Sequence, residues 1–361
     1  MQREFSRRIK RVVLKIGASV ITDNQGFLEE GQIVRLADEV SALKKKGIDF
    51  VLVTSGAVAC GMQLLNFTCR PKDLSCLQAT AALGQNLLMR MYFDAFKRHG
   101  FLCAQVLLTW EDINDRRRYI NAKNTLLKLL EYGVIPVVNE NDTVAVDEIK
   151  FGDNDRLSAL VAGILNADLL ILASDVDGLY AAGTKEVIPQ ISDLKEEIAV
   201  LARDTDKKHT SVGGMKTKLE AAKIAMTSGI PCVVANGKTS GMLSGVIQGE
   251  EVGTVFMQRP KALKAKKHWL AFSAKPKGRI FVDDGAREAL INKGKSLLCP
   301  GIINVEGKFQ AEDAVMIVDR EGREFGRGIC EFSSAELSRL KGCRINQEVI
   351  HRDNLVVLKK E

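Results

Sequence analysis

Residues 134–165 of the chain read VIPVVNENDTVAVDEIKFGDNDRLSALVAGIL. The apolar run at 134–138 has the length and composition of a buried strand. Residues 155–165 have the apolar spacing of a helix. A loop rich in acids and amides joins the two. A buried strand that passes through a polar loop into a helix is the repeating unit of a parallel α/β sheet, and this stretch therefore predicts the fold class.

The chain up to about residue 258 repeats this alternation. The other expected strands lie at 12–16, 50–54, 102–108, 169–174 and 231–235, and the expected helices at 32–46, 79–98, 121–131, 155–165 and 215–227. Buried strands separated by helices predict an open, mostly parallel sheet sandwiched by helices. In such sheets the ligand binds beyond the carboxyl ends of the strands, so the search for a site begins there.

Length and composition fit a globular protein of about two domains. The chain has 361 residues, with 52 Lys and Arg against 45 Asp and Glu, a net charge of +7. No run approaches 18 apolar residues and the start does not resemble a signal peptide, so we expect a cytoplasmic protein without a membrane partner. The eight cysteines form no CxxC pair, which favours reduced thiols over a zinc site.

Composition changes near residue 259. Residues 259–279 contain eight Lys or Arg and no Asp or Glu. After them, β-like runs at 278–282, 301–305, 314–318 and 324–330 alternate with turns and two short helical stretches, at 285–293 and 333–341. We therefore expect an α/β domain at 8–258, a basic linker at 259–277 and a small β-rich barrel at 278–356.

Two glycine-containing elements suit phosphate binding, although neither a P-loop nor a GxGxxG motif occurs. Lys15 and Gly17 end the first strand, where a point charge and a close backbone approach favour an anion. Gly213 and Gly214 precede Lys216 and Lys218 at a helix start, which favours an anion in the same way. The alternative is that these lysines are ordinary surface residues.

Two further elements suit an amino acid. Ser55, Gly56 and Ala57 follow a buried strand and open a helix, where free N–H groups can bind a carboxylate. The loop after residue 138 mixes acids with amides, a combination that can hold a zwitterion; its candidate residues are Asn139, Asp142 and Asn154. The alternatives are an ordinary tight turn, a solvated acidic loop and, for Asp155, a helix cap.

Six motifs, in order, resemble the amino acid kinase family, and within it the members that phosphorylate glutamate. They are VLKIGASVI, LVTSGAVACG, PVVNENDTV, EIKFGDNDRLSALVA, SDVDGLY and VGGMKTKLEAA, all between residues 12 and 223. The tail GRIFVDDGAREALINKGKSLLCPGI resembles a PUA domain. NEND followed by GDND is the most specific of these features.

The resemblance implies phosphorylation of the γ-carboxylate of L-glutamate by ATP with Mg²⁺, the first step of proline biosynthesis. It places Lys15 and Lys218 against ATP, with Asp155 orienting both lysines. The residues that it implies for ATP also include Ser174, Asp175, Gly213, Gly214, Met215, Lys216 and Thr217, and those for glutamate are Ser55, Asp142 and Asn154.

The same resemblance implies a homo-oligomer, with proline as a feedback inhibitor, and assigns no residue as a direct Mg²⁺ ligand. One departure is Ser211-Val212, where the family has Gly-Thr before the glycine pair, and the tail is shorter than usual. Two alternatives stay open. One is another carboxylate kinase of the family, acting on aspartate or acetylglutamate. The other is an RNA-binding protein that acts through the PUA-like domain.

Overall fold

The computed structural model describes residues 3, 5, 8–23, 25–145, 154–181, 183–192, 214–258, 265–343 and 348–358. The chain divides into two compact units. The first comprises Met1–Asp112 and Ile120–Ala262, and the second comprises Ile113–Tyr119 and Leu263–Glu361.

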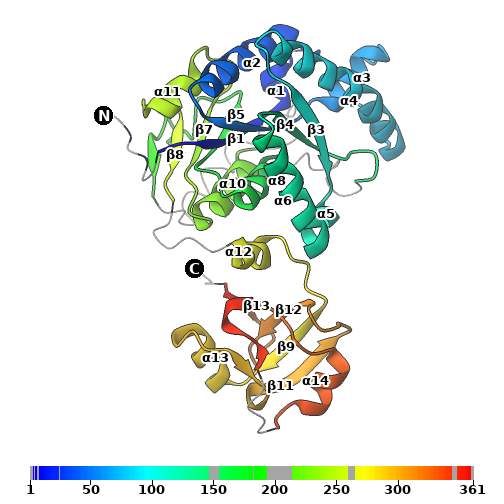
Figure 1. The fold of residues 1–361 in the computed structure, drawn as a ribbon, viewed down its shortest axis with the longest axis vertical. Coiled ribbons are helices and arrows are strands. Elements are labelled where there is room, and N and C mark those ends of the chain that lie inside the picture. The colour runs from blue at the N-terminus through cyan, green and yellow to red at the C-terminus, as the bar shows by residue number, and fades with distance from the viewer. Residues whose placement is uncertain are drawn as a thin grey trace. The chain divides into compact units, whose positions relative to one another are not determined.

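The first unit is built on an eight-stranded sheet with the strand order β3-β4-β2-β1-β5-β7-β8-β6 (Figure 1). Neighbours from β3 to β7 are parallel, β8 is antiparallel to β7, and β6 is parallel to β8. The open, mostly parallel sheet is therefore confirmed. The strands are β1 (Arg11–Ile16), β2 (Asp49–Thr54), β3 (Cys103–Leu108), β4 (Ile135–Glu140), β5 (Leu169–Ser174), β6 (Gln190–Ile191), β7 (Cys232–Asn236) and β8 (Thr254–Phe256).

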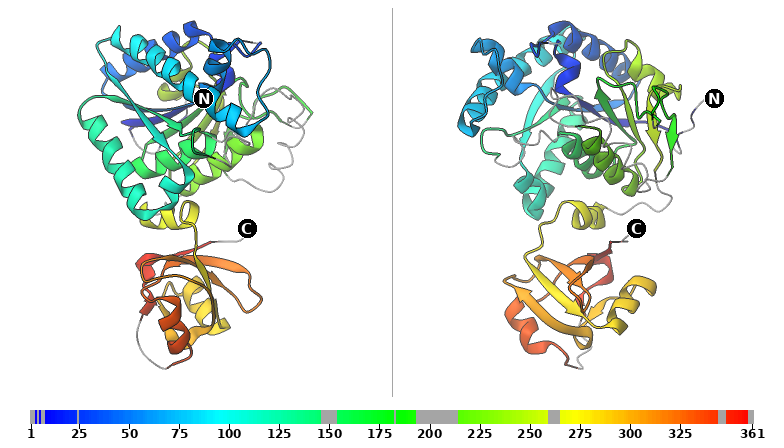
Figure 2. Two further views of the ribbon diagram at one scale, coloured as in Figure 1. Left: turned by 90° about the vertical axis from the view of Figure 1, so that its right-hand side faces the viewer. Right: turned by 180° about the vertical axis from the view of Figure 1, so that it is seen from behind.

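Helices cover both faces of this sheet (Figures 1 and 2). One face carries α1 (Ala18–Ile21), α2 (Glu30–Lys45), α3 (Ala57–Leu64), α4 (Leu74–Lys97) and α11 (Met242–Gln248). On the other face lie α6 (Arg116–Glu131), α8 (Asn154–Leu165) and α10 (Met215–Thr227), and the short α5 (Trp110–Asn114) precedes α6.

The alternation of side chains along β1 decides where Lys15 points. Val12, Leu14 and Ile16 belong to the apolar core under α2 and α4. Successive residues of a strand point to opposite faces. Lys15 therefore points to the face of α8 and α10, where it is 6% exposed.

The second unit contains a five-stranded sheet with the order β11-β9-β12-β13-β15, of which Figure 1 labels four strands, and a two-stranded sheet, β10-β14. Its apolar core includes Ile280, Ile317 and Val349. The elements are α12 (Ala265–Phe272), β9 (Gly278–Val282), α13 (Asp284–Asn292), β10 (Leu297–Leu298), β11 (Ile302–Gly307), β12 (Ala314–Val318), β13 (Glu324–Ile329), α14 (Ser334–Leu340), β14 (Glu348–Ile350) and β15 (Leu355–Val357), with 3-10 turns at Cys299–Gly301 and Arg352–Asn354.

Several helices and strands begin or end at other residues than the sequence predicts. The helix expected at 79–98 begins at Leu74, because the Asp73 carboxylate caps it by accepting the Cys76 N–H at 3.0 Å. The helix expected at 121–131 begins at Arg116, in a basic stretch without apolar spacing. The expected linker contains α12.

Two further observations bear on the chemistry expected from the sequence. All eight cysteines are free thiols. In the described part of the chain, no helix is both long and apolar enough to cross a membrane.

Candidate active site

Four parallel strands end at one edge of the sheet and bring the sequence candidates together. β1 ends beside β2 and β5, with Ile16 opposite both Thr54 and Ala173. β4 ends at Glu140, and its loop continues into Asn141 and Asp142. This is the carboxyl edge of the sheet, where α/β proteins bind their ligands.

Asp155 lies between two lysines at this edge. Its Oδ1 is 2.5 Å from Lys15 Nζ, and its Oδ2 is 3.5 Å from Lys218 Nζ. Asp155 is 1% exposed, and each lysine is 6% exposed. The lysines come from β1 and from α10, which are far apart in the sequence, so it is the fold that brings these two charges to one carboxylate.

This trio carries a net positive charge in a buried place. Burial alone would raise the pKa of Asp155, but the charges of Lys15 and Lys218 outweigh it and hold the pKa below its ordinary value. Burial lowers the pKa of Lys218, and the charge of Asp155 opposes that shift. The carboxylate is thus ionised and shared, and the site attracts an anion.

Thr217 completes the support of Asp155. Its hydroxyl donates a hydrogen bond to Asp155 Oδ2 at 2.8 Å, and the carbonyl oxygen of Gly214 is 2.9 Å from the same hydroxyl. Gly214 is the N-cap of α10. The sequence suggested Thr217 as an ATP contact, whereas the structure gives it a further contact, with the carboxylate between the lysines.

Asn154 links the ends of two strands, β2 and β4. Its Nδ2 donates to Thr54 O at 2.9 Å, to Ser55 Oγ at 2.8 Å and to Asn139 Oδ1 at 3.1 Å. Its Oδ1 is buried and has no hydrogen-bond partner among the described residues. Because Ser55 Oγ accepts from Asn154, its own hydrogen is left to donate elsewhere.

Asn139 is held inside this framework. Its Oδ1 also accepts the Glu140 N–H at 2.9 Å, and its Nδ2 donates to Gln85 Oε1 at 2.8 Å. Asn139 is 1% exposed. These contacts engage both the oxygen and the nitrogen of its side-chain amide. Asn139 therefore orients Asn154, whether or not it also contacts a ligand.

Asp142 lies in the loop after β4 and is half-buried. Burial raises its pKa to about 6, and the charge of Arg70, in the loop between α3 and α4, opposes the shift. Arg70 could not be predicted from local sequence, because it lies in a loop about 70 residues before Asp142 along the chain.

Gly56 allows the tight passage from β2 into α3. Its φ is +112°, a conformation that favours glycine, and an added Cβ would lie 2.8 Å from Ile21 Cδ1. Ala57 is the first residue of α3, so the N-terminus of this helix opens next to Ser55. This arrangement agrees with the expected carboxylate-binding turn.

The other expected residues take varied positions. Gly17 donates its N–H to Ala173 O at 3.1 Å, and an added Cβ would lie 3.5 Å from Lys15 Nζ. Ser174 ends β5 and donates to Asp175 Oδ1 at 3.1 Å. Met215 is buried, whereas Lys216 and Asp175 are exposed. Gly213, Ser211 and Val212 lie outside the described residues, as do residues 146–153 of the acidic loop.

Three residues that support the site gave no signal in the sequence. Gln85 orients Asn139, and Tyr92 shares a 2.8 Å hydrogen bond with Thr54 Oγ1. Both lie on α4 and face the strand ends. Trp110 stacks on the guanidinium of Arg156, next to Asp155, at 4.4 Å from ring centroid to Cζ. Such contacts link distant segments and cannot be read from local spacing.

The part of the chain that the structure describes offers few ligands for a divalent cation. Among the described residues, no group of three or more His, Cys, Asp or Glu side chains is placed to hold a metal. Mg²⁺ in phosphoryl-transfer sites commonly keeps several waters and uses one or two carboxylates. The exposed carboxylate of Asp175, close enough to Lys218 to affect its pKa, fits that limited role.

The chain matches two known families. Residues 10–236 match the amino acid kinase family, and residues 278–351 match the PUA domain. The first match contains the whole strand edge described above, and the second coincides with the β-rich part of the second unit.

Full-length relatives narrow this result. A glutamate 5-kinase of Pelobacter propionicus is 45% identical over 374 residues, which covers 99% of this chain and 100% of that protein. A glutamate 5-kinase of Caldanaerobacter subterraneus is 44% identical and covers 97% of this chain and 98% of the relative. The chain therefore belongs to the amino acid kinase family, and within that family to the glutamate 5-kinases.

A solved structure shares the fold. Carbamate kinase from Giardia lamblia bound to AMP-PNP aligns with a TM-score of 0.50 over 69% of this chain and 99% of that chain. The sequence identity is 18%, so this likeness concerns the fold alone.

Proposed function

We propose that the chain transfers the γ-phosphoryl group of ATP to the γ-carboxylate of L-glutamate, giving L-glutamyl 5-phosphate, the first step of proline biosynthesis. The observation that carries the proposal is the buried trio of Lys15, Asp155 and Lys218, with a net positive charge at the carboxyl edge of the sheet. Full-length relatives named glutamate 5-kinase support the choice of substrate.

The reaction needs charge neutralisation more than proton transfer. A glutamate side chain has a pKa of about 4.3, so it is already a carboxylate nucleophile at pH 7 and needs no general base. The barrier arises because two anions must approach each other. The ammonium groups of Lys15 and Lys218 offset that repulsion, and Asp155 keeps both groups in place.

We assign glutamate recognition to the residues at the ends of β2 and β4. The hydroxyl hydrogen of Ser55 and the N-terminus of α3 suit a carboxylate. Asp142 and Asn154 Oδ1, which has no hydrogen-bond partner among the described residues, suit the ammonium group. Asn139 holds Asn154 in position for this contact.

The ATP side uses the lysines together with Gly17, Ser174, Asp175 and the start of α10 from Gly214 to Lys218. When bound, Mg²⁺ neutralises part of the phosphate charge. Asp175 is the described residue best placed to hold it, because it is exposed at the end of β5 and near Lys218.

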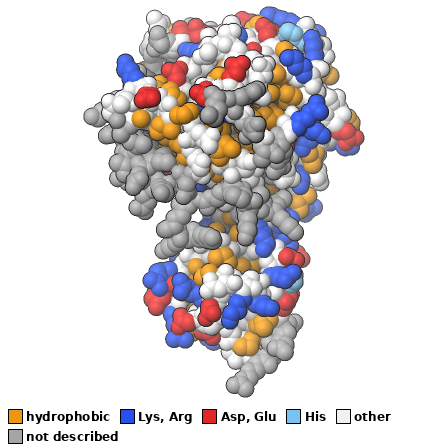
Figure 3. Space-filling view, turned by 90° about the vertical axis from the view of Figure 1, so that its left-hand side faces the viewer, with side chains coloured by type: hydrophobic (Ala, Val, Ile, Leu, Met, Phe, Trp, Pro, Cys, Tyr) orange, Lys and Arg blue, Asp and Glu red, His pale blue; other side chains and the backbone are white. Residues whose placement is uncertain are grey.

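RNA binding through the PUA domain is not favoured by the charge distribution. Residues 278–351 contain 11 Lys and Arg against 12 Asp and Glu. On the face that Figure 3 shows, positive and negative side chains are interspersed over this unit. Nucleic-acid-binding domains typically show a basic patch or stripe.

The experiment that tests the function is hydroxamate formation. The chain is incubated with ATP, Mg²⁺, hydroxylamine and either L-glutamate or L-aspartate, because hydroxylamine traps an acyl phosphate as a stable hydroxamate. We expect product with glutamate and little with aspartate. A signal with aspartate but none with glutamate would overturn the substrate assignment.

Two further properties, inhibition by proline and assembly into a homo-oligomer, remain predictions. Proline is expected to inhibit the enzyme, and repeating the hydroxamate assay with added proline tests this directly. The family resemblance also predicts a homo-oligomer, a dimer or a tetramer, and such assemblies are usually symmetric. Light scattering of the purified protein measures its mass.

A further inference from the structure

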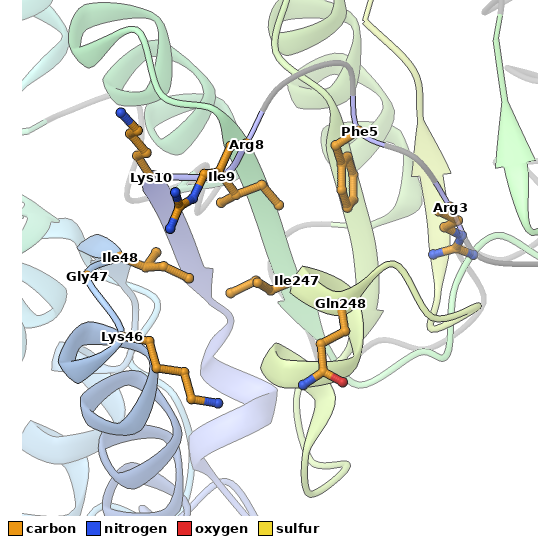
Figure 4. A pocket seen from close by; sticks show the side chains of 10 residues that line it. All are labelled: Arg3, Phe5, Arg8, Ile9, Lys10, Lys46, Gly47, Ile48, Ile247 and Gln248. Carbon is orange, nitrogen blue, oxygen red and sulfur yellow. The ribbon is translucent and has the colours of Figure 1, made fainter.

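A pocket of about 720 Å³ lies in the first unit, away from the strand edge that carries Lys15. It is lined by the chain before β1, by the turn between α2 and β2, and by the end of α11 (Figure 4). This is the amino edge of the sheet. Lys10 and Lys15 are five residues apart along an extended strand, which separates the two edges by roughly 16 Å.

The lining combines positive charge with apolar surface. Four of the ten lining residues are Arg or Lys, and none of the ten is Asp or Glu. The apolar lining comes from Phe5, Ile9, Ile48 and Ile247. A pocket of this size with an apolar wall and a few polar groups is typical of a small-molecule site.

The four cationic residues are not equivalent. Arg3 already donates hydrogen bonds to the carbonyl oxygens of Val252, Pro189 and Gly253. In Figure 4 the Lys10 side chain points away from the other lining residues. The side chains of Arg8 and Lys46 lie on either side of Ile48, are exposed, and form no salt bridge with a described carboxylate.

The described acids near the pocket have other partners. Asp168 is close to the pocket, but its Oδ2 accepts the backbone N–H groups of Lys10 and Arg11, each at 2.9 Å. Asp49 pairs with Lys44 at 3.5 Å. Among the described residues, no carboxylate therefore pairs with Arg8 or Lys46.

We propose that this pocket binds a small organic phosphate, with its phosphate on Arg8 and Lys46 and its apolar body on Ile9, Ile48, Ile247 and Phe5. A guanidinium can contact two phosphate oxygens at once, and an ammonium group adds a point charge, so the pair suits a dianion. The apolar wall favours a phosphate that carries a hydrocarbon or aromatic group over inorganic phosphate.

The test uses phenyl phosphate as the probe and ligand-observed NMR on the full chain, with inorganic phosphate as the comparison. We expect saturable binding of phenyl phosphate with a Kd below about 10 mM, and weaker binding of inorganic phosphate. Lys46→Glu and Arg8→Ala should each weaken phenyl phosphate binding by at least about fivefold, because each removes a charged contact.

Lys45→Glu is the matched control. Lys45 is also exposed at the end of α2, but it does not line the pocket. It should leave binding within about twofold of the wild type, since an exposed charge outside the site acts weakly. Absence of saturable binding, binding unaffected by Lys46→Glu, or equal losses in the Lys45 and Lys46 variants would overturn the proposal. Thermal melting shows whether each variant is folded.

Discussion

We expect the charge on Lys218 to matter most while charge develops during phosphoryl transfer. Lys218 is buried beside Asp155, 3.5 Å from its Oδ2. We expect Lys218→Ala to lower kcat by roughly 10²–10³-fold, with both KM values changed by less than about threefold, as for the loss of one preorganised charge-stabilising group. The hydroxamate assay at saturating substrates measures this.

Lys223→Ala is the control for that variant, because Lys223 is exposed on the same helix. It should keep near-normal kcat. A Lys218 variant with unchanged kcat and a raised KM would mean that this lysine contributes ordinary ground-state binding.

Asp142 gives a prediction about pH. Its pKa is raised to about 6 by burial, so the carboxylate takes up a proton as the pH falls through 6. The neutral form attracts an ammonium group less, and KM for glutamate at pH 5.5 should be about four times that at pH 7.5. The Asp142→Asn variant should have a high KM for glutamate that no longer varies between pH 5.5 and pH 7.5. If its KM varied with pH as that of the wild type does, Asp142 would not be the cause of the pH dependence.

At the scale of elements, the contact between α3 and α4 lies beside the residues that we assign to glutamate binding. An added Cβ on Gly84 would lie 1.9 Å from Ala57 O and 2.3 Å from Gly61 N. Gly84→Ala must therefore push the two helices apart, and we expect a melting temperature lower by roughly 5–10 °C.

Gly31→Ala is the matched substitution, because Gly31 is also helical and an added Cβ would meet nothing within 4 Å. It should raise stability by about 0.5 kcal/mol through helix propensity. Similar melting temperatures for the two variants would show that the close approach of α3 and α4 does not limit stability.

The elements also show what the sequence could predict. β5 and α10 were expected at their observed bounds, because a continuous apolar run and a regular helical spacing are strong signals. β6, β8 and β10 have only two or three residues, too few for a period. Their existence depends on pairing with distant strands.

The same distinction applies to the site. Lys15, Asp155 and Lys218 could be predicted as candidates from their local motifs and the family resemblance. Their meeting could not be predicted from spacing, because it depends on the face to which β1 directs Lys15 and on α8 packing beside α10. Gln85 and Arg70 were missed because their partners are distant in the sequence. Gln85 reaches Asn139 at the end of β4 from α4, and Arg70 lies near Asp142, in the loop after β4, from the loop before α4.

At the scale of the whole molecule, Ile113–Tyr119 belongs to the second unit although its neighbours in sequence belong to the first. The indole N–H of Trp269 donates to Ile113 O at 3.0 Å, and Trp269 packs edge-on against Tyr119. We expect a chain that ends at Met257 to fold and form hydroxamate, but to melt roughly 5 °C or more lower, because buried aromatic contacts are lost.

A chain that ends at Ala274 is the control, since it retains α12 and Trp269. It should melt higher than the chain that ends at Met257. Equal melting temperatures would mean that Trp269 does not stabilise the segment Ile113–Tyr119, and insoluble protein in both cases would mean that the PUA domain is required for folding.

We propose that this molecule is a kinase for free glutamate and that it recognises the substrate through its ammonium group. The most direct test is kcat/KM for hydroxamate formation with L-glutamate and with N-acetyl-L-glutamate, which lacks that charge. N-acetylglutamate would leave the buried polar groups of the site without their ammonium partner, and such a site discriminates strongly between two substrates. We therefore predict that kcat/KM is at least about 10³ times higher for glutamate than for N-acetylglutamate. Comparable values, or a preference for N-acetylglutamate, would contradict the account.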